Sequence, residues 1–386
     1  MQLGKMLDAA RNTGEPKPYL GNRAVQWGRI DVSAAGVVPM TRADMHRYRL
    51  RQGDLLVCEG GEVGRAAIWQ NQLAECYFQK ALHRLRPKGG FDVRLMLAFL
   101  EYWANTGAFA NYVTQTSIAH LPRDKFISMP LPFPSPSEQR RLGELFDDLN
   151  GLATALQRLM AKKRAIKQGL MQQLLTGKTR LPGYRETWNE ARLGDHASMS
   201  SGGTPPSGVA KYYGGGIPWV SISDMTRAGR FVHATEKTLS ADGLAHCTAK
   251  LYPEGAVLYA MYASLGECAI AMGRVSSSQA ILGIVPGRDL HRDYLYYCLT
   301  AMKAQVREMG QQGTQANLNA TMVRDLRILL PPLDEQEAIA KVLSDADDEL
   351  DHLRVRLDKE RAVRTGVMQE LLTGRTQLSG GTEDAK

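Results

Sequence analysis

Residues 138–177 read EQRRLGELFDDLNGLATALQRLMAKKRAIKQGLMQQLLTG, and residues 335–374 read EQEAIAKVLSDADDELDHLRVRLDKERAVRTGVMQELLTG. Both segments begin with Glu-Gln and end with Leu-Leu-Thr-Gly, and both landmarks are separated by the same 197 positions (335 − 138 and 374 − 177). A similarity at a fixed period is the signature of a duplicated structural unit. The sequence therefore predicts two copies of one unit, each ending in this segment.

Each copy has the apolar spacing of a long helix that packs along a narrow stripe. In the first copy a Ser-Pro start and a Gly stop at residue 177 bound the pattern. The stripe comprises Leu142, Leu145, Leu149, Leu152, Leu156, Leu159, Ile166 and Leu170, then Ile339, Val342, Ala346, Leu350, Leu353, Leu357, Val363 and Val367 in the second copy. Segment 137–187 has 10 basic and 5 acidic residues, whereas 332–386 has 8 and 13. This opposite charge favours an antiparallel coiled coil of the two helices, each about 60 Å long. The alternative is two amphipathic helices that pack on their own domains.

The remaining sequence predicts two globular α+β halves with similar patterning. Gly53-Asp54-Leu55-Leu56 resembles Gly255-Ala256-Val257-Leu258, Gly64 matches Gly266, and Trp27 to Asp31 loosely matches Trp219 to Asp224. Short β-rich runs alternate with glycine-rich turns, and 94–102 and 292–305 have helical patterning. The predicted domains are 1–133, a helix and linker at 134–187, a second globular domain at 188–331, a helix at 332–378 and a polar tail at 379–386.

Composition limits the classes of protein that fit. The 386 residues carry a net charge of +8, and 44% of them are apolar. No signal core or stretch of about 20 apolar residues occurs, so we expect a cytoplasmic protein. Five scattered cysteines predict neither a disulfide framework nor a zinc site. The basic surplus suits a polyanionic partner.

Catalytic motifs are missing from the sequence. Gly177-Lys178-Thr179 resembles the end of a phosphate-binding loop, but residue 172 is Gln where that loop needs Gly. It also closes a helix where the loop would open one, so we interpret Gly177 as a helix stop. Neither an Asn/Asp-Pro-Pro-aromatic methyltransferase motif nor an H-E-x-x-H metal motif occurs. We therefore expect a chain that is not an enzyme.

The duplicated unit resembles the specificity subunits of type I restriction-modification systems. The marks are the Glu-Gln helix start, the L-L-T-G-[KR]-T end and, in the second half, Leu193-Gly194-Asp195, 201–205 (SGGTP) and 212–219 (YYGGGIPW). In the first half Leu3-Gly4-Lys5 stands where the family has Leu-Gly-Asp. The resemblance implies that each half reads one part of a split DNA target and that the helices fix the spacing. It also implies partners: two modification subunits, which bind S-adenosylmethionine, and restriction subunits that use ATP. No cofactor is expected in this chain.

Polar, glycine-rich loops and a cluster of arginines are the candidate DNA-binding segments. Phosphate contacts would hold the register, and polar side chains at the groove edges would discriminate bases. For each residue the alternative is an ordinary solvated loop, and for the whole chain it is a coiled-coil adaptor that binds protein only. The candidates are Arg42, Arg47, Arg49, Arg51, Gly60, Gly61, Thr114, Gln115, Thr116, Lys211, Tyr212, Tyr213, Tyr262, Ser264, Gln312, Thr314 and Gln315.

Overall fold

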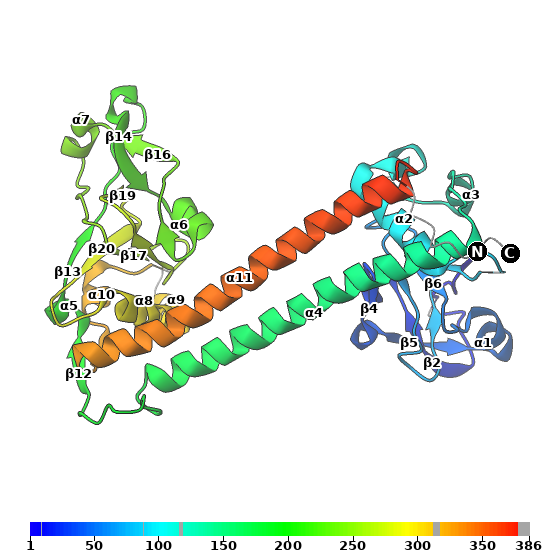
Figure 1. Cartoon of the computed structure of the whole chain (residues 1–386), viewed down its shortest axis with the longest axis horizontal. Coiled ribbons are helices and arrows are strands. Elements are labelled where there is room, and N and C mark those ends of the chain that lie inside the picture. The colour runs from blue at the N-terminus through cyan, green and yellow to red at the C-terminus, as the bar shows by residue number, and fades with distance from the viewer. Residues whose placement is uncertain (9, 88, 116–118, 312–316, 377–386) are drawn as a thin grey trace, which may run out of the picture. The chain divides into compact units, whose positions relative to one another are not determined.

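A computed structural model describes residues 1–376 except 9, 88, 116–118 and 312–316. The chain divides into two compact units (Figure 1). Unit 1 comprises Met1–Leu159 and Leu353–Lys386, and unit 2 comprises Met160–His352. Both long helices, α4 (Pro136–Leu174) and α11 (Leu333–Leu372), therefore contribute one part to each unit.

Unit 1 contains a four-stranded and a three-stranded sheet, and two two-stranded pairs, β3 with β4 and β10 with β11. Its four-stranded sheet has the order β1-β9-β6-β7, and its three-stranded sheet has the order β5-β2-β8. Helix α2 packs on the larger sheet, because its buried side shares a core with Leu55 and Val57. The elements are β1 (Gln2–Leu3), β2 (Glu15–Leu20), β3 (Val25–Gln26), β4 (Arg29–Ile30), β5 (Gly36–Met40), α1 (Arg42–Tyr48), β6 (Leu55–Cys58), β7 (Ala66–Ile68), β8 (Tyr77–Phe78), β9 (Leu82–Leu85), α2 (Val93–Thr106), β10 (Thr114–Gln115), β11 (Ala119–His120) and α3 (Arg123–Ile127).

Unit 2 contains a five-stranded sheet, β13-β20-β17-β18-β15, and a three-stranded sheet, β16-β14-β19. A further pair, β12 with β21, borders the start of α11. The elements are β12 (Asn189–Arg192), α5 (Leu193–His196), β13 (Ala197–Ser201), β14 (Tyr213–Val220), α6 (Ile222–Ala228), β15 (Phe231–Val232), β16 (Lys237–Leu239), α7 (Ala241–Ala245), β17 (Val257–Ala260), β18 (Cys268–Ala271), β19 (Ser276–Ser277), β20 (Ile281–Pro286), α8 (Arg292–Ala301), α9 (Lys303–Gln311), α10 (Ala320–Arg324) and β21 (Arg327–Leu330). The predicted α+β class is confirmed.

The two units share strand order and turn geometry. In each three-stranded sheet the central strand is antiparallel to one neighbour and parallel to the other. Gly53 and Gly255 have φ of 83° and 84°, and Gly64 and Gly266 have φ of 81° and 76°. Such values favour glycine, which explains why these positions match in the sequence.

One predicted correspondence is wrong. The parallel ladder of unit 2 pairs Trp219 with Ser276, and that of unit 1 pairs Tyr19 with Tyr77. Tyr19, in the central strand β2, therefore occupies the place of Trp219. Trp27 lies in the turn between β3 and β4, where its indole donates to the Glu62 carboxylate at 2.6 Å.

A buried glutamine ties the start of each long helix to its domain. In unit 1 the Gln139 amide oxygen accepts from the Asp92 backbone N–H at 2.9 Å, and its amide nitrogen donates to the Pro134 carbonyl at 2.9 Å. In unit 2 Gln336 accepts from the His291 N–H at 2.8 Å and donates to the Pro331 carbonyl at 2.8 Å. Asp92 and His291 cap α2 and α8, so the recurring glutamine makes the same contacts in both units.

A glycine follows the last turn of both long helices within three residues, as predicted. Gly177 and Gly374 have φ of 68° and 72°, and each backbone N–H bonds a carbonyl three residues earlier. Gly177 is therefore a left-handed helix stop and not part of a phosphate-binding loop. Within the described part of the chain, no helix combines the length and the apolar character needed to cross a bilayer.

The predicted apolar stripe is shifted by one position in part of each helix. Leu159 and Ile166 are 39% and 46% exposed, whereas Leu156 and Met160 are buried. In α11 the side chain of Val363 is also exposed. The buried side of α4 instead continues through two lysines that pair with acidic residues of α11, Lys163 with Glu349 at 2.6 Å and Lys167 with Asp347. The predicted stripe included the exposed Leu159 and Ile166, whereas the buried side of α4 carries Lys163 and Lys167 in this region.

Candidate nucleic-acid interface

The arginine surface of unit 1 comprises Arg42, Arg47, Arg49 and Arg51. All four side chains are exposed, and they lie on α1 and the segment that leads into β6. Among the described residues none of the four forms an ion pair with a carboxylate: Asp44 pairs with Lys5 at 2.8 Å, and Asp54 pairs with Arg86 at 2.6 Å. Two alternatives to DNA contact exist for these arginines, a solvated face or pairing with Asp44 and Asp54, and the structure contradicts only the pairing.

Two further arginines lie beneath this surface. The buried Arg84 guanidinium donates to the carbonyl of Arg49 at 3.0 Å, and Arg86 donates to the same carbonyl at 3.3 Å. Burial lowers the pKa of Arg84 below its ordinary value. The nearby cations Arg86 and Arg51 lower this pKa further, whereas the carboxylate of Asp54 raises it. The backbone that carries the arginine surface is thus held by two further cations. Arg84 lies on β9 and Arg86 lies just after it, more than thirty positions after Arg51 in the sequence. Because they are so distant along the chain, the sequence does not mark them as neighbours of the arginine surface.

The glycine turn of unit 1 lies beside the β10–β11 hairpin. Gly60 forms a bridge with His120, and the Leu121 N–H donates to the Glu59 carbonyl at 2.7 Å. The turn at Gly60 and Gly61 therefore lies beside β11, and β11 in turn pairs with Thr114 and Gln115, so these segments form one loop cluster. Thr116 lies outside the described residues. The cluster is at the opposite end of β6 from Arg51, so the structure does not join it to the arginine surface.

Unit 2 has an equivalent loop cluster. The turn between β17 and β18 consists of Tyr262, Ala263 and Ser264. The Leu318 N–H donates to the Met261 carbonyl at 3.0 Å, and the equivalent bond in unit 1 runs from the Leu121 N–H to the Glu59 carbonyl. The Tyr262 side chain is 37% exposed. Gln312, Thr314 and Gln315 lie outside the described residues. Leu318, which follows them in the sequence, is hydrogen-bonded beside this turn.

The side chains of the Lys211–Tyr213 segment differ in exposure and in contacts, because Lys211 is exposed whereas Tyr212 and Tyr213 are half-buried. Lys211 is exposed, lies 5.5 Å from the Tyr212 ring centroid and reaches Asp242 at 3.7 Å. Tyr212 stacks on His246 with 5.0 Å between ring centroids. The Tyr213 hydroxyl donates to the Pro205 carbonyl at 2.8 Å, and its ring packs against Trp219. Lys211 and Tyr212 are thus available to a ligand, whereas Tyr213 supports the strand.

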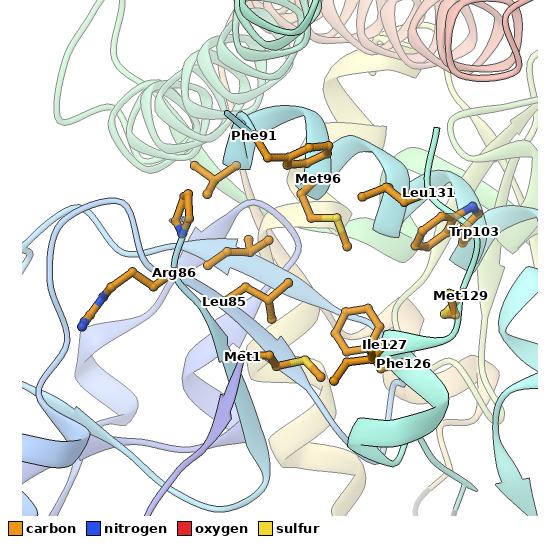
Figure 2. Close-up of a pocket in the computed structure, with 13 residues that line it drawn as sticks. Met1, Leu85, Arg86, Phe91, Met96, Trp103, Phe126, Ile127, Met129 and Leu131 are labelled. Atoms are coloured by element: carbon orange, nitrogen blue, oxygen red, sulfur yellow. The ribbon is translucent and has the colours of Figure 1, made fainter. Parts of the chain in front are cut away.

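A cavity in unit 1 has a mainly apolar lining (Figure 2). It has a volume of about 350 Å³ and lies between β6, β9, α2 and α3. Met96 and Trp103 line one side, Phe126 and Ile127 line the other, and the guanidinium of Arg86 points away from it. Such a lining supplies no acid, base or nucleophile. Among the described residues no group of three or more His, Cys, Asp or Glu side chains is arranged to hold a metal ion.

Comparison with known proteins gives one consistent result. Residues 185–358 match the family model of the type I restriction modification DNA specificity domain. A putative type I restriction enzyme MjaX specificity subunit of Methanocaldococcus jannaschii is 22% identical over 373 residues, which are 91% of this chain and 85% of that protein. The Escherichia coli EcoR124I/EcoR124II specificity subunit is 22% identical over 288 residues, 71% of this chain and 69% of that protein.

Solved structures share the fold over nearly the whole chain. The type I restriction-modification system S subunit from M. genitalium aligns with a TM-score of 0.60 at 13% identity, covering 96% of this chain and 92% of that one. A chain from a structural study of complex assembly and conformational transition of the type I R-M system aligns with a TM-score of 0.61 at 18% identity, covering 96% and 94%. Residues 185–358 thus match a type I restriction modification DNA specificity domain, and the chain as a whole is similar in sequence to type I restriction enzyme specificity subunits and has the fold of the solved ones.

Proposed function

We propose that this chain reads a bipartite DNA target, one part with each globular half, and positions adenine methyltransferase subunits there. The observation that carries the proposal is the duplicated topology of the two units, joined to a family whose matched domain is a DNA specificity domain. Two related domains on one chain suit two separated patches of one duplex. The domains at 1–133 and 188–331 are the two readers, and the segments at 134–187 and 332–378 are the spacers.

We further propose that α4 and α11 pair as an antiparallel coiled coil that acts as a ruler. Each unit supports antiparallel pairing separately. In unit 1 the start of α4, at Leu142 and Phe146, shares a core with Met368 near the end of α11. In unit 2 the end of α4, at Leu174, shares a core with Ile339 near the start of α11. With 39 and 40 residues, the helices are about 60 Å long at ~1.5 Å per residue.

The ruler predicts a spacer that depends on helix length. Inserting four residues after Ala161 and four after Asp358 adds about one turn, ~6 Å, to each helix. The preferred spacer should lengthen by one or two base pairs, measured by methylation of duplexes that differ only in spacer length. A functional variant with an unchanged spacer would refute the ruler.

Recognition and chemistry are divided between subunits in this proposal. Methylation should require added modification subunits, which supply the S-adenosylmethionine site. Turnover of S-adenosylmethionine by the isolated chain would overturn this division. Whether restriction subunits join the same assembly is tested by co-purification and ATP-dependent cleavage.

Two experiments separate the proposal from the alternative, a coiled-coil adaptor without DNA specificity. Mapping methylated adenines in a host with and without the chain should reveal one split target that disappears with the chain. Replacing residues 1–133 with the corresponding domain of a relative should change one half of that target only. An adaptor that binds protein only would show no salt-dependent DNA binding in a titration.

A further inference from the structure

Arg230 lies where the second recognition domain meets the long helix α11. It immediately precedes β15, and its backbone carbonyl accepts from the Ile270 N–H of β18 at 2.7 Å. The backbone of Arg230 is therefore fixed to the edge of the five-stranded sheet. Its side chain is only 11% exposed.

The guanidinium of Arg230 connects that sheet to two helices. One terminal nitrogen donates to the Asp293 carboxylate of α8 at 2.7 Å. The other donates to the Ser344 hydroxyl of α11 at 2.9 Å and lies 4.0 Å from the Asp347 carboxylate. Because the group is planar and its nitrogens are rigidly spaced, these contacts fix an angle as well as a distance.

Aromatic rings and a lysine of α4 complete the arrangement. The guanidinium carbon lies 4.6 Å from the Phe231 ring centroid, 4.9 Å from that of Tyr297 and 5.3 Å from that of Tyr296. The Tyr297 hydroxyl donates to Asp347 at 2.8 Å, and Lys167 of α4 pairs with the same carboxylate. The network therefore extends from the recognition sheet through α8 and α11 to α4, entirely inside unit 2.

The apolar core beneath this network does not define the angle by itself. Unit 2 packs on α11 through Ile339, Ala340 and Leu343, which share a core with α8. Hydrophobic burial stabilises this contact but is not directional. Buried polar groups are best attested as devices that fix register, often with little net effect on stability.

We propose that Arg230 is a positioning residue that fixes the angle of the second recognition domain on α11 and so sets how strictly the complex measures the DNA spacer. This proposal rests on the bipartite function proposed above. Each added base pair turns one half of the target by about 35° around the duplex and moves it by about 3.4 Å. A domain held on α11 by its apolar core and by Gln336 at the start of the helix follows such a turn more easily than a domain that Arg230 also holds.

The test uses the complete chain assembled with its modification subunits. Methylation is measured on duplexes that carry the host target with the native spacer and with one base pair more or fewer. Arg230→Lys keeps the charge and loses the planar fork, and Arg230→Met removes the charge while Asp293 keeps Arg292 at 2.8 Å. Arg288→Lys, at an exposed site of the same domain, is the matched control.

Both Arg230 variants should lower the ratio of native-spacer to altered-spacer methylation about tenfold and leave base discrimination within each half unchanged. The control should keep the wild-type ratio. If Arg230→Met fails to assemble, Arg230→Lys and Ser344→Ala, which removes only the hydroxyl contact, decide the question by a change in the same ratio. Wild-type ratios in the assembled variants would overturn the role of Arg230. Equal methylation of all spacers by the wild-type complex would instead overturn the bipartite function.

Discussion

The equivalent turns of the two loop clusters predict opposite effects from opposite substitutions. Gly61 has φ of 77°, and Ala263, which holds the same place in the β17–β18 turn, has φ of 60°. A Cβ built at Gly61 meets no atom within 4 Å, so only the backbone conformation opposes a side chain there. Gly61→Ala should therefore destabilise unit 1, and Ala263→Gly should stabilise unit 2.

The size of each stability change follows from two opposing contributions to the free energy of unfolding. The left-handed conformation costs a residue with a Cβ about 1–2 kcal/mol. Glycine loses more backbone entropy on folding, which offsets about 0.5–1 kcal/mol of that cost. A net change of about 0.5–1 kcal/mol remains for each substitution. For units of this size it corresponds to a shift of roughly 1–4 °C in Tm.

Calorimetry of the two variants measures these shifts, and Gly151→Ala is the matched control. Gly151 lies in α4 with open space around its Cβ position, so alanine there should raise stability by about 0.5–1 kcal/mol. Gly61→Ala and Gly151→Ala should thus shift Tm in opposite directions although the chemical change is the same. A Gly61→Ala protein as stable as wild type, or an Ala263→Gly protein that is less stable, would refute the reasoning.

Three other predictions address the surface and the buried contacts. Replacing Arg47 and Arg49 with Ala should weaken specific and non-specific DNA binding about equally. The slope of log affinity against log salt should flatten by roughly one unit per lost phosphate contact. An unchanged slope in a fluorescence titration would mean that the arginine surface does not contact phosphates. Gln336→Ala leaves the His291 N–H without its acceptor and should cost unit 2 about 1–3 kcal/mol in denaturant unfolding, so a change within error would contradict that contact. Burial would raise the pKa of Asp293, but hydrogen bonds from Arg292 and Arg230 outweigh it and hold the pKa below its ordinary value of 3.8. The stability from this carboxylate is therefore present above about pH 4 and lost as the pH falls through the lowered pKa, and Asp293→Asn should remove that part of the acid transition.

The sequence predicted the framework well because the framework depends on local rules that repeat. The glycines before and after β6 and β17 are needed for positive φ, and the helix stops are needed for the same reason. Gln139 and Gln336 recur because each satisfies a backbone N–H that the fold buries. Such positions tolerate few residue types, so a repeat survives there and can be seen without an alignment.

The buried side of α4 could not be predicted fully, because apolar spacing marks it only where the partner contact is apolar. Lys163 and Lys167 lie on that side and face acidic residues of α11. Leu159 and Ile166, which precede Met160 and Lys167 by one position, fit the apolar spacing although their side chains are exposed. Pairing between distant segments carries no local signal, and for the same reason Arg84 was missed beneath the arginine surface.

The two units differ where the proposed function needs them to differ. Helix α1 of unit 1 has the sequence RADMHRY and leads into the arginine surface, whereas α7, which follows the equivalent strand β16, has the sequence ADGLA and carries no cation. Both begin at a hydroxyl cap, Thr41 and Ser240, so their local framework is shared. The arginines of α1 thus have no counterpart on α7, although the two helices occupy equivalent places on a common scaffold. A pair of readers with one scaffold and two unlike surfaces predicts a target whose halves differ in sequence, and a palindromic target in the methylation map would contradict it.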